Sequence, residues 1–146
     1  MLQTLLDSCA ALGVPLTAAQ AEQLCAFGAR LLEQNRVMNL TAITEPQAVA
    51  KLHFADCLAL LRIVPFPGKR VIDVGCGSGI LGISAVKLGA RFAVMTDIDG
   101  IAAESALHNA QLNGVAEKTQ VVLTDLLDKT DTKGEIVLAN ITADIL

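Results

Sequence analysis

Residues 71–82 read VIDVGCGSGILG, a short apolar run followed by glycines at alternate positions. The run at 71–74 predicts a buried strand, and the segment from 80 to 88 predicts a helix. The glycines between them let the backbone turn sharply and approach a ligand without interference from a Cβ atom. Amides at the start of the following helix then point at whatever the loop holds. This stretch therefore predicts a strand, a ligand-binding loop and a helix.

The remainder of the second half repeats this alternation. Strands are expected at 92–96, 119–123 and 135–139, and a helix is expected at 100–112. Alternating strands and helices with short connections predict a parallel sheet with right-handed crossovers. The fold class is therefore α/β, a Rossmann-like core.

The first 65 residues show a different pattern, in which apolar residues recur at helical spacing. Helices are expected at 2–12, after a capping box at 17–20, and after a second capping-box pattern at 44–47. The apolar faces of the last two helices are expected to include Leu24, Phe27, Leu31, Val49, Leu52, Leu60 and Leu61. The chain thus divides into a helical cap region, residues 1–65, and a partial cofactor-binding domain, residues 66–146.

The composition excludes several classes of protein. With 146 residues, of which 53% are hydrophobic, the chain can bury a core and is not expected to be disordered. No apolar run approaches the roughly 18 residues of a membrane span, and the first residues do not resemble a signal peptide, so no membrane partner is expected. The four cysteines lack metal-binding spacing, which predicts free thiols in the cytoplasm and no metal site.

Charge is distributed unevenly along the chain. Residues 71–146 carry five Lys or Arg and ten Asp or Glu. This acidic half is poorly suited to a phosphate-rich polymer and better suited to a small or cationic ligand. Arg62, Lys69 and Arg70 form either a modest RNA-facing patch or, in the interpretation that we favour, a solvated surface.

Three carboxylates surround the predicted ligand loop. Asp73 precedes the loop, Asp97 ends the second strand and Asp125 follows the third. A carboxylate at Asp97 can accept hydrogen bonds from both ribose hydroxyls, and Asp125 is within reach of an adenine amino group. A carboxylate at Asp73, at the mouth of the loop, favours an ammonium or sulfonium group. The set describes adenosine attached to a cationic group, which S-adenosylmethionine matches.

Each of these residues also has a simpler structural interpretation. Asp97 and Asp99 can cap the following helix, for which we favour Asp99, and Asp125 can be a turn residue. Cys76 is interpreted as a small residue filling the loop rather than as a nucleophile. The spacing Gly77-x-Gly79-x-x-Gly82 also fits a dinucleotide fingerprint, so an NAD-binding Rossmann protein remains an alternative, although Asp73 would repel a pyrophosphate.

The motif at 73–79 together with TDID at 96–99 resembles class I S-adenosylmethionine-dependent methyltransferases. Residues 71–146 resemble more specifically the bacterial family that methylates lysines of a large-subunit ribosomal protein. The similar stretches are 71–79, 97–99, NAQLNG at 109–114 and LANITADIL at 138–146.

Residues 31–75 instead resemble the bacterial small-subunit ribosomal RNA guanine-N7 methyltransferases. The matching stretches are LLEQN at 31–35, NLTAI at 39–43 and HFADCL at 53–58. The loop continues with Ile80-Leu81-Gly82, where that RNA family has Phe-Pro-Gly. The chain therefore resembles a chimera of two relatives, and its substrate is expected to be either ribosomal RNA or a ribosomal protein.

These resemblances imply roles for individual residues. The methionine part of S-adenosylmethionine would lie against Asp73, Gly75, Gly77 and Gly79, the ribose on Asp97 and the adenine near Asp125; Cys76 and Ile98 complete the candidate cofactor contacts. Asn140 would lie beside the transferred methyl group and orient the substrate amine, as the candidate catalytic residue.

In class I methyltransferases, which the sequence resembles, further strands follow the fourth. The resemblance therefore implies a core truncated after strand four, with about four strands in the order 3-2-1-4. An uncovered apolar fourth strand invites self-association. A catalytically inactive chimera that keeps the fold is the alternative to a working methyltransferase.

Overall fold

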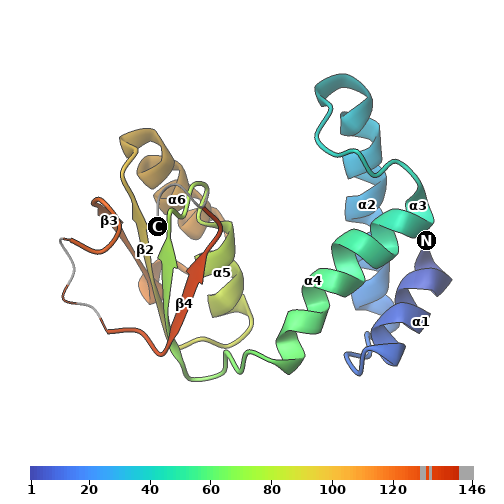
Figure 1. Ribbon diagram of the computed structural model, residues 1–146, viewed down its shortest axis with the longest axis horizontal. Helices are drawn as coiled ribbons and strands as arrows, with labels where there is room; N and C mark the ends of the chain where they lie inside the picture. Colours follow the sequence, from blue (N-terminus) through green and yellow to red (C-terminus); the bar gives the residue numbers. More distant parts are fainter. Residues whose placement is uncertain (129–130, 132, 142–146) are drawn as a thin grey trace. The chain divides into compact units, whose positions relative to one another are not determined.

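The computed structural model describes residues 1–128, 131 and 133–141. The chain forms two compact units, Met1–Pro65 and Phe66–Leu146. Figure 1 shows that the first contains helices and the second contains the sheet.

The first unit is a set of helices around a small apolar core. Leu5, Cys9, Ala21, Val49 and Phe54 are buried together in that core. The elements are α1 (Leu2–Ala11), α2 (Ala18–Met38), α3 (Pro46–Ala48), the π-helix η1 (Val49–Ala55), α4 (Asp56–Ala59) and the 3₁₀ helix η2 (Leu60–Arg62).

The two predicted capping boxes have different outcomes. The box before α2 is confirmed, because the Thr17 side chain accepts from the Gln20 N–H and the Gln20 side chain accepts from the Thr17 N–H. The box at 44–47 is wrong, because α3 begins at Pro46 and its N-cap, Glu45, makes no side-chain capping bond. Pro46 fixes the backbone of the first turn without needing an N–H donor, so this helix starts without a box.

The π-helix explains why part of the predicted apolar face is wrong. Its backbone bonds run from residue i to i+5, so a face recurs at longer intervals than the 3.6 residues of an α-helix. Positions 49, 50, 54 and 55 are accordingly buried. Leu52, within this π-helix, is 60% exposed, although α-helical spacing places it on the buried face. Leu60, also expected on that face, begins the 3₁₀ helix η2 and is 45% exposed. Phe27 on α2 is also exposed, at 58%, and its ring lies 5.8 Å from that of Phe54.

The second unit contains a fully parallel four-stranded sheet, as predicted. Its strands are β1 (Arg70–Val74), β2 (Phe92–Asp97), β3 (Thr119–Leu123) and β4 (Ile136–Ala139), in the order β3-β2-β1-β4. Central strands of parallel sheets are buried on both faces, and β1 shows this from Val71 to Val74.

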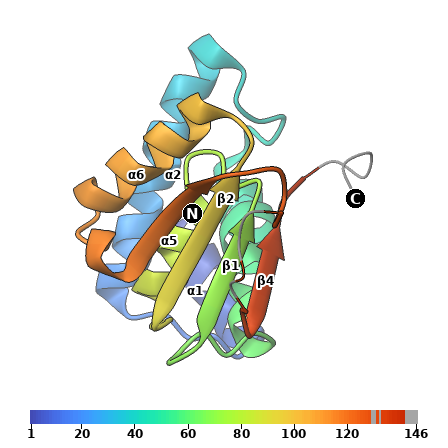
Figure 2. The ribbon, with the colours of Figure 1, turned by 90° about the vertical axis from the view of Figure 1, so that its left-hand side faces the viewer.

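Two helices connect these strands, α5 (Ile80–Lys87) and α6 (Gly100–Leu112), and the 3₁₀ helix η3 (Ala116–Lys118) precedes β3. Figures 1 and 2 show α5 and α6 on the same face of the sheet. A Cβ atom at Gly82 would lie 2.6 Å from Met95 Cγ, so the glycine allows α5 to approach β2 closely. Right-handed crossovers between neighbouring parallel strands place both helices on this face.

The register aligns the carboxyl ends of the strands. Val74 of β1 lies opposite Thr96 of β2 and opposite Ala139 of β4, and Thr96 lies opposite Val122 of β3. Residues that follow the strands therefore meet at one edge of the sheet, where ligands bind in open α/β folds.

β4 lies at the other end of the strand order from β3. Among the described residues it pairs only with β1, and Val137 is 59% exposed. Within the same part of the chain, no helix combines the length and the apolar character that crossing a bilayer requires.

Candidate functional site

The glycine loop lies between β1 and α5. Gly75, Gly77 and Gly79 have φ angles of 65°, 53° and 80°, in the left-handed region that favours glycine. A Cβ atom at Gly75 would lie 2.5 Å from Ile141 Cγ2, so the start of the loop also has no room for a side chain. The loop is therefore a cradle of bare backbone at the carboxyl edge of the sheet.

Asp73 lies beneath this loop rather than at its mouth. Only 1% of the residue is exposed, and its Oδ2 accepts a 2.8 Å hydrogen bond from the Gly82 N–H. Its Oδ1 is buried without a hydrogen-bond partner. Burial raises the pKa of Asp73 to about 6, the Gly82 bond lowers it, and the charge of Asp97 raises it further. Asp73 thus anchors the start of α5 through the Gly82 N–H.

Asp97 connects the end of β2 to the glycine loop. Its Oδ2 accepts from the Gly77 N–H at 2.8 Å, and its Oδ1 accepts from the Asp99 N–H at 2.9 Å. Each carboxylate oxygen can accept more than one hydrogen bond, so Asp97 keeps acceptor capacity for hydroxyl groups. The preferred capping role of Asp99 is confirmed, because its side chain accepts from the Ile101 N–H at the start of α6.

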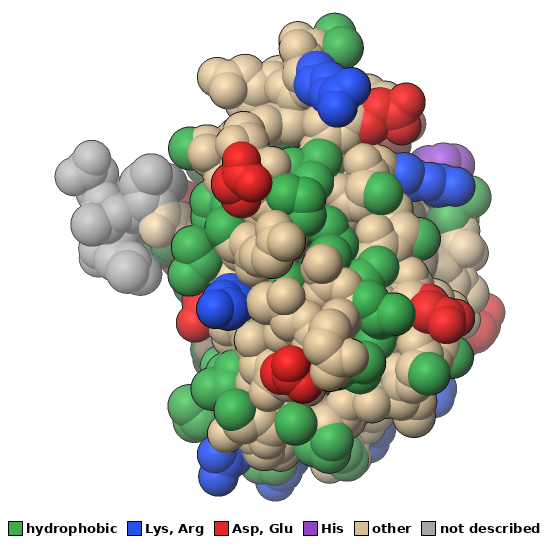
Figure 3. Space-filling model, turned by 90° about the vertical axis from the view of Figure 1, so that its right-hand side faces the viewer, with side chains coloured by type: hydrophobic (Ala, Val, Ile, Leu, Met, Phe, Trp, Pro, Cys, Tyr) green, Lys and Arg blue, Asp and Glu red, His purple; other side chains and the backbone are tan. Residues whose placement is uncertain are grey.

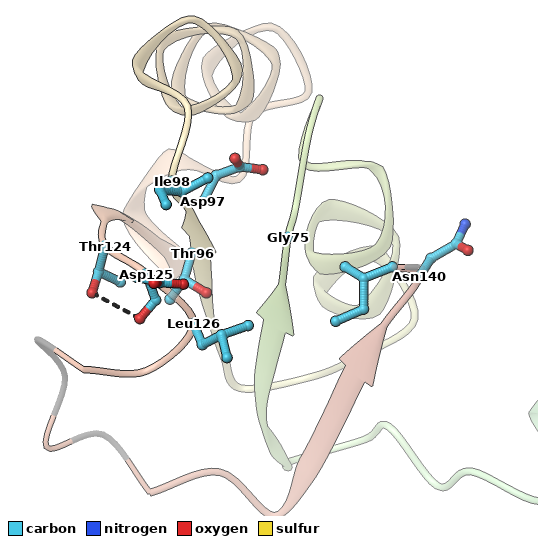
Figure 4. A pocket seen from close by; sticks show the side chains of 9 residues that line it. Gly75, Thr96, Asp97, Ile98, Thr124, Asp125, Leu126 and Asn140 are labelled. Atoms are coloured by element: carbon cyan, nitrogen blue, oxygen red, sulfur yellow. Dashed lines mark hydrogen bonds between the residues drawn. The ribbon is translucent and has the colours of Figure 1, made fainter. Parts of the chain in front are cut away.

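A pocket of about 350 Å³ opens at this edge of the sheet (Figure 4). The predicted site residues that line it are Gly75, Asp97, Ile98, Asp125 and Asn140. The other predicted site residues, which do not line it, are Asp73, Cys76, Gly77 and Gly79. The structure therefore brings together the residues assigned to the ribose and the adenine. The glycine loop adjoins them, because the Gly77 N–H donates a hydrogen bond to Asp97.

Sequence reasoning missed four residues that line this pocket: Thr96, Thr124, Leu126 and Ile141. The first two immediately precede Asp97 and Asp125 at the ends of neighbouring strands. The rule that ligands bind outside the carboxyl ends of parallel strands was the signal that could have found them.

Cys76 has the loop-filling role that was predicted for it. It is 6% exposed, and its N–H donates a 2.9 Å hydrogen bond to the Thr96 carbonyl. Burial, followed by the charges of Asp73 and Asp97, raises the pKa of the Cys76 thiol to about 12. The thiol is therefore protonated near neutral pH, which makes it a poor nucleophile.

Asn140 follows β4 and is exposed. In Figure 4 its amide points away from the other labelled side chains of the pocket. The adjoining Ile141 packs against the glycine loop at Gly75. Positions 142–146 of the 138–146 resemblance stretch lie outside the described residues.

The described residues contain no group of three or more His, Cys, Asp or Glu side chains arranged to hold a metal ion. All four cysteines are free thiols. The polar groups that surround the pocket are backbone amides, the carboxylates of Asp97 and Asp125, two threonine hydroxyls and the amide of Asn140.

The strand order, the glycine loop after β1 and the carboxylate at the end of β2 are consistent with a Rossmann-like fold of the class I methyltransferase type. A family model described as ribosomal protein L11 methyltransferase (PrmA) matches residues 54–146. The chain belongs to this family. The match favours the methyltransferase interpretation over the NAD-binding alternative.

Individual relatives agree with this assignment. The ribosomal protein L11 methyltransferase of Pelotomaculum thermopropionicum is 48% identical over 90 residues, which is 62% of this chain and 29% of the relative. That of Histophilus somni strain 2336 is 49% identical over 89 residues, 61% of this chain and 30% of the relative. The chain thus spans less than a third of the length of these curated relatives.

A solved structure shows the same fold. The ribosomal protein L11 methylase of Lactobacillus delbrueckii subsp. bulgaricus is 40% identical, with a TM-score of 0.55. The similarity covers 58% of this chain and 44% of that one.

Proposed function

We propose that the unit Phe66–Leu146 binds S-adenosylmethionine and that the protein transfers its methyl group to a ribosomal protein. The observation that carries this proposal is the position of Asp97. Its carboxylate lines the pocket and also accepts a hydrogen bond from the Gly77 N–H of the glycine loop. The curated relatives, named as ribosomal protein L11 methyltransferases, support the substrate.

The residues present fit this cofactor. The ribose would bind Asp97, and the adenine would lie near Ile98 and Asp125, all of which line the pocket. The methionine part would lie along the backbone of Gly75, Cys76, Gly77 and Gly79, over the negative charge of Asp73. When bound, the cofactor supplies a methyl group on a cationic sulfonium, which this charge favours over a pyrophosphate.

Asn140 is proposed to orient the substrate. Its amide oxygen would accept a hydrogen bond from the substrate amine and direct the nitrogen lone pair at the methyl group. Methyl transfer of this kind is an in-line displacement, so positioning supplies much of the rate. Asn140 lines the pocket, and its amide, which points away from the other labelled side chains in Figure 4, would rotate toward them to do this.

The charge of the chain favours a protein substrate over RNA. Residues 1–65 carry four Lys or Arg and five Asp or Glu, and residues 66–146 carry seven and ten. Phosphate-rich polymers are bound mainly through Lys and Arg. On the face drawn in Figure 3, these side chains lie singly or in small groups among hydrophobic and acidic ones. A cationic, lysine-bearing protein segment is the better complement.

The three residues considered for an RNA-facing patch also have partners within the protein. Lys69 Nζ lies 2.9 Å from Glu135 Oε1. The Arg62 guanidinium donates to the Leu12 carbonyl, and the guanidinium of Arg70 lies 5.4 Å from the centre of the Phe92 ring.

We further propose that residues 31–75 derive from a relative of the ribosomal RNA guanine-N7 methyltransferases, so that the chain would be a chimera of two relatives. The three stretches that carry this resemblance are bonded to one another. The Asn35 side chain makes two hydrogen bonds with the Thr41 backbone, and Thr41 Oγ1 lies 3.0 Å from His53 Nε2. These bonds show that the three stretches form one local arrangement, and a ribosomal RNA substrate is the corresponding second candidate.

Two further proposals concern the state of the protein. Strand β4, which pairs only with β1 among the described residues, would pair along its other edge with a second copy. Light scattering tests this, and a monomer at high concentration would contradict it. A cytoplasmic location is supported by the four free cysteines.

Cofactor binding is tested by isothermal titration with S-adenosylhomocysteine. We expect one binding site and a dissociation constant at least about tenfold higher for Asp97→Ala, because charge-assisted hydrogen bonds contribute about 1.5–3 kcal/mol. Asp99→Asn is the matched control, since asparagine caps helices as well as aspartate does. Absence of binding by the folded wild-type protein would refute the proposal.

The substrate is tested separately with S-adenosylmethionine labelled in the methyl group and with purified ribosomal subunits. Label in the protein fraction supports the proposal, and label in the RNA fraction supports the second candidate. Label in neither fraction, from a protein that binds the cofactor, supports the inactive alternative.

A further inference from the structure

Helix α6 contacts the glycine loop on a side that the pocket does not use. The Asn109 side chain donates a hydrogen bond from Nδ2 to the Ser78 carbonyl at 2.9 Å, across 31 residues of sequence. Neither residue lines the pocket. The contact therefore acts on the shape of the loop rather than directly on a ligand.

The close approach of α6 to the loop depends on a small residue on each side. A Cβ atom at Gly79 would lie 3.1 Å from Ala106 Cβ and 3.2 Å from Ala106 Cα. Ala106 is fully buried. Ala106 and Asn109 are three residues apart and so lie on one face of α6. Ala106 sets the distance between helix and loop, and Asn109 makes the hydrogen bond across it.

Two other attachments hold the loop from the β2 side. The Cys76 N–H donates to the Thr96 carbonyl at 2.9 Å, and the Gly77 N–H donates to Asp97 Oδ2 at 2.8 Å. Asn109 thus completes a series of bonds to three successive residues, Cys76, Gly77 and Ser78. A loop this rich in glycine loses much conformational entropy when it is ordered, so bonds made before the ligand arrives improve affinity.

We propose that Asn109 is a positioning residue for cofactor binding. Its amide fixes the Ser78 carbonyl, and this holds the Gly75–Gly79 turn in the shape that receives the cofactor. The inference rests on the proposed function, because it assumes that this turn binds an S-adenosyl compound. Without the hydrogen bond from Asn109 to Ser78, the turn would become ordered only when the ligand binds, which weakens binding.

The test compares Asn109→Asp and Asn109→Ala with Asn113→Ala. Aspartate has nearly the shape of asparagine but cannot donate to a carbonyl, and alanine removes the bond without adding charge. The control residue, Asn113, lies one turn further along, and its Nδ2 donates to the Asn109 carbonyl rather than to the loop. Thermal unfolding by circular dichroism establishes that each variant is folded.

Two readouts are needed, and the first is the dissociation constant of S-adenosylhomocysteine. We expect both Asn109 variants to bind about five- to tenfold more weakly, the effect of one hydrogen bond of about 1 kcal/mol, and Asn113→Ala to bind as the wild type does. Equal affinity of the wild type and the Asn109 variants, or equal weakening by Asn113→Ala, would overturn the proposal.

The second readout is hydrogen exchange of the loop amides without ligand. We expect faster exchange at 76–79 in the Asn109 variants and unchanged exchange in β1 and β2. Unchanged exchange in the loop would overturn the proposal. If the wild type binds no S-adenosylhomocysteine, the proposed function fails, and the exchange measurement still decides whether Asn109 orders the loop.

Discussion

Replacement of Asp73 by asparagine should change how the stability of the protein depends on pH. Burial raises the pKa of Asp73 from 3.8 to about 6. The folded protein therefore binds this proton more tightly than the unfolded chain does. The free energy of unfolding should fall as the pH rises from about 4 to about 6, and then stay constant with respect to this group.

The size of this effect follows from the shift in pKa. At about 1.36 kcal/mol for each pKa unit, the shift corresponds to about 3 kcal/mol of stability lost between low and neutral pH. The asparagine side chain in Asp73→Asn would still offer an oxygen to the Gly82 N–H but does not titrate. The difference in unfolding free energy between wild type and Asp73→Asn should therefore change by about this amount across the range.

Urea unfolding at pH 4, 5, 6, 7 and 8 measures this difference. Far-ultraviolet circular dichroism is the suitable signal, because the chain has no Trp or Tyr. Asp99→Asn, which removes an exposed carboxylate, controls for the change in net charge. A constant difference between wild type and Asp73→Asn from pH 4 to pH 7 would refute the reasoning.

Three further predictions concern the same protein. In thermal unfolding, Gly75→Ala should lose about 1–3 kcal/mol more stability than Gly114→Ala. The two glycines have nearly the same φ angle, 65° and 66°, but only Gly75 has a neighbour within 4 Å of the added Cβ. Equal losses of stability in the two variants would contradict this. Glu135 has its pKa lowered by the hydrogen bond from Lys69 and then by that from the Arg70 N–H. The ionised Glu135 should therefore stabilise the folded protein above pH 4.5, and this stabilisation should be lost as the pH falls through the lowered pKa. In acid unfolding, Glu135→Gln should lack this loss. Parallel acid unfolding curves of the wild type and Glu135→Gln would argue against it. Iodoacetamide at pH 8 should modify the exposed Cys57 before the buried Cys76, as peptide mass mapping would show, and the reverse order would disprove the burial argument.

The strands of the second unit were predictable from short apolar runs, which burial on both faces explains for β1 and β2. β3 lies at the predicted 119–123, and the other strands differ from prediction by one residue at an end. The helical unit was less predictable. A π-helix at Val49–Ala55 changes which residues share a face, and no local signal announced it, so Leu52 was placed on the wrong side.

The part of the site that lies at the carboxyl ends of the strands was predictable from the sequence. Asp97 ends β2 and Asp125 follows β3, and the parallel topology brings them to one pocket. Asp73 was predicted at the mouth of the loop but is buried, because its carboxylate turns toward the Gly82 N–H, a contact nine residues away that depends on how α5 packs. The Asn109 bond to Ser78 similarly depends on the approach of α6 to the loop.

A crystal structure of the protein with S-adenosylhomocysteine tests the central claim most directly. We predict the ribose hydroxyls on the Asp97 carboxylate, the adenine beside Ile98 and Asp125, and the amino acid part along the backbone of the glycine loop. A ligand bound elsewhere, or a glycine loop and a pocket that make no contact with it, would contradict the account.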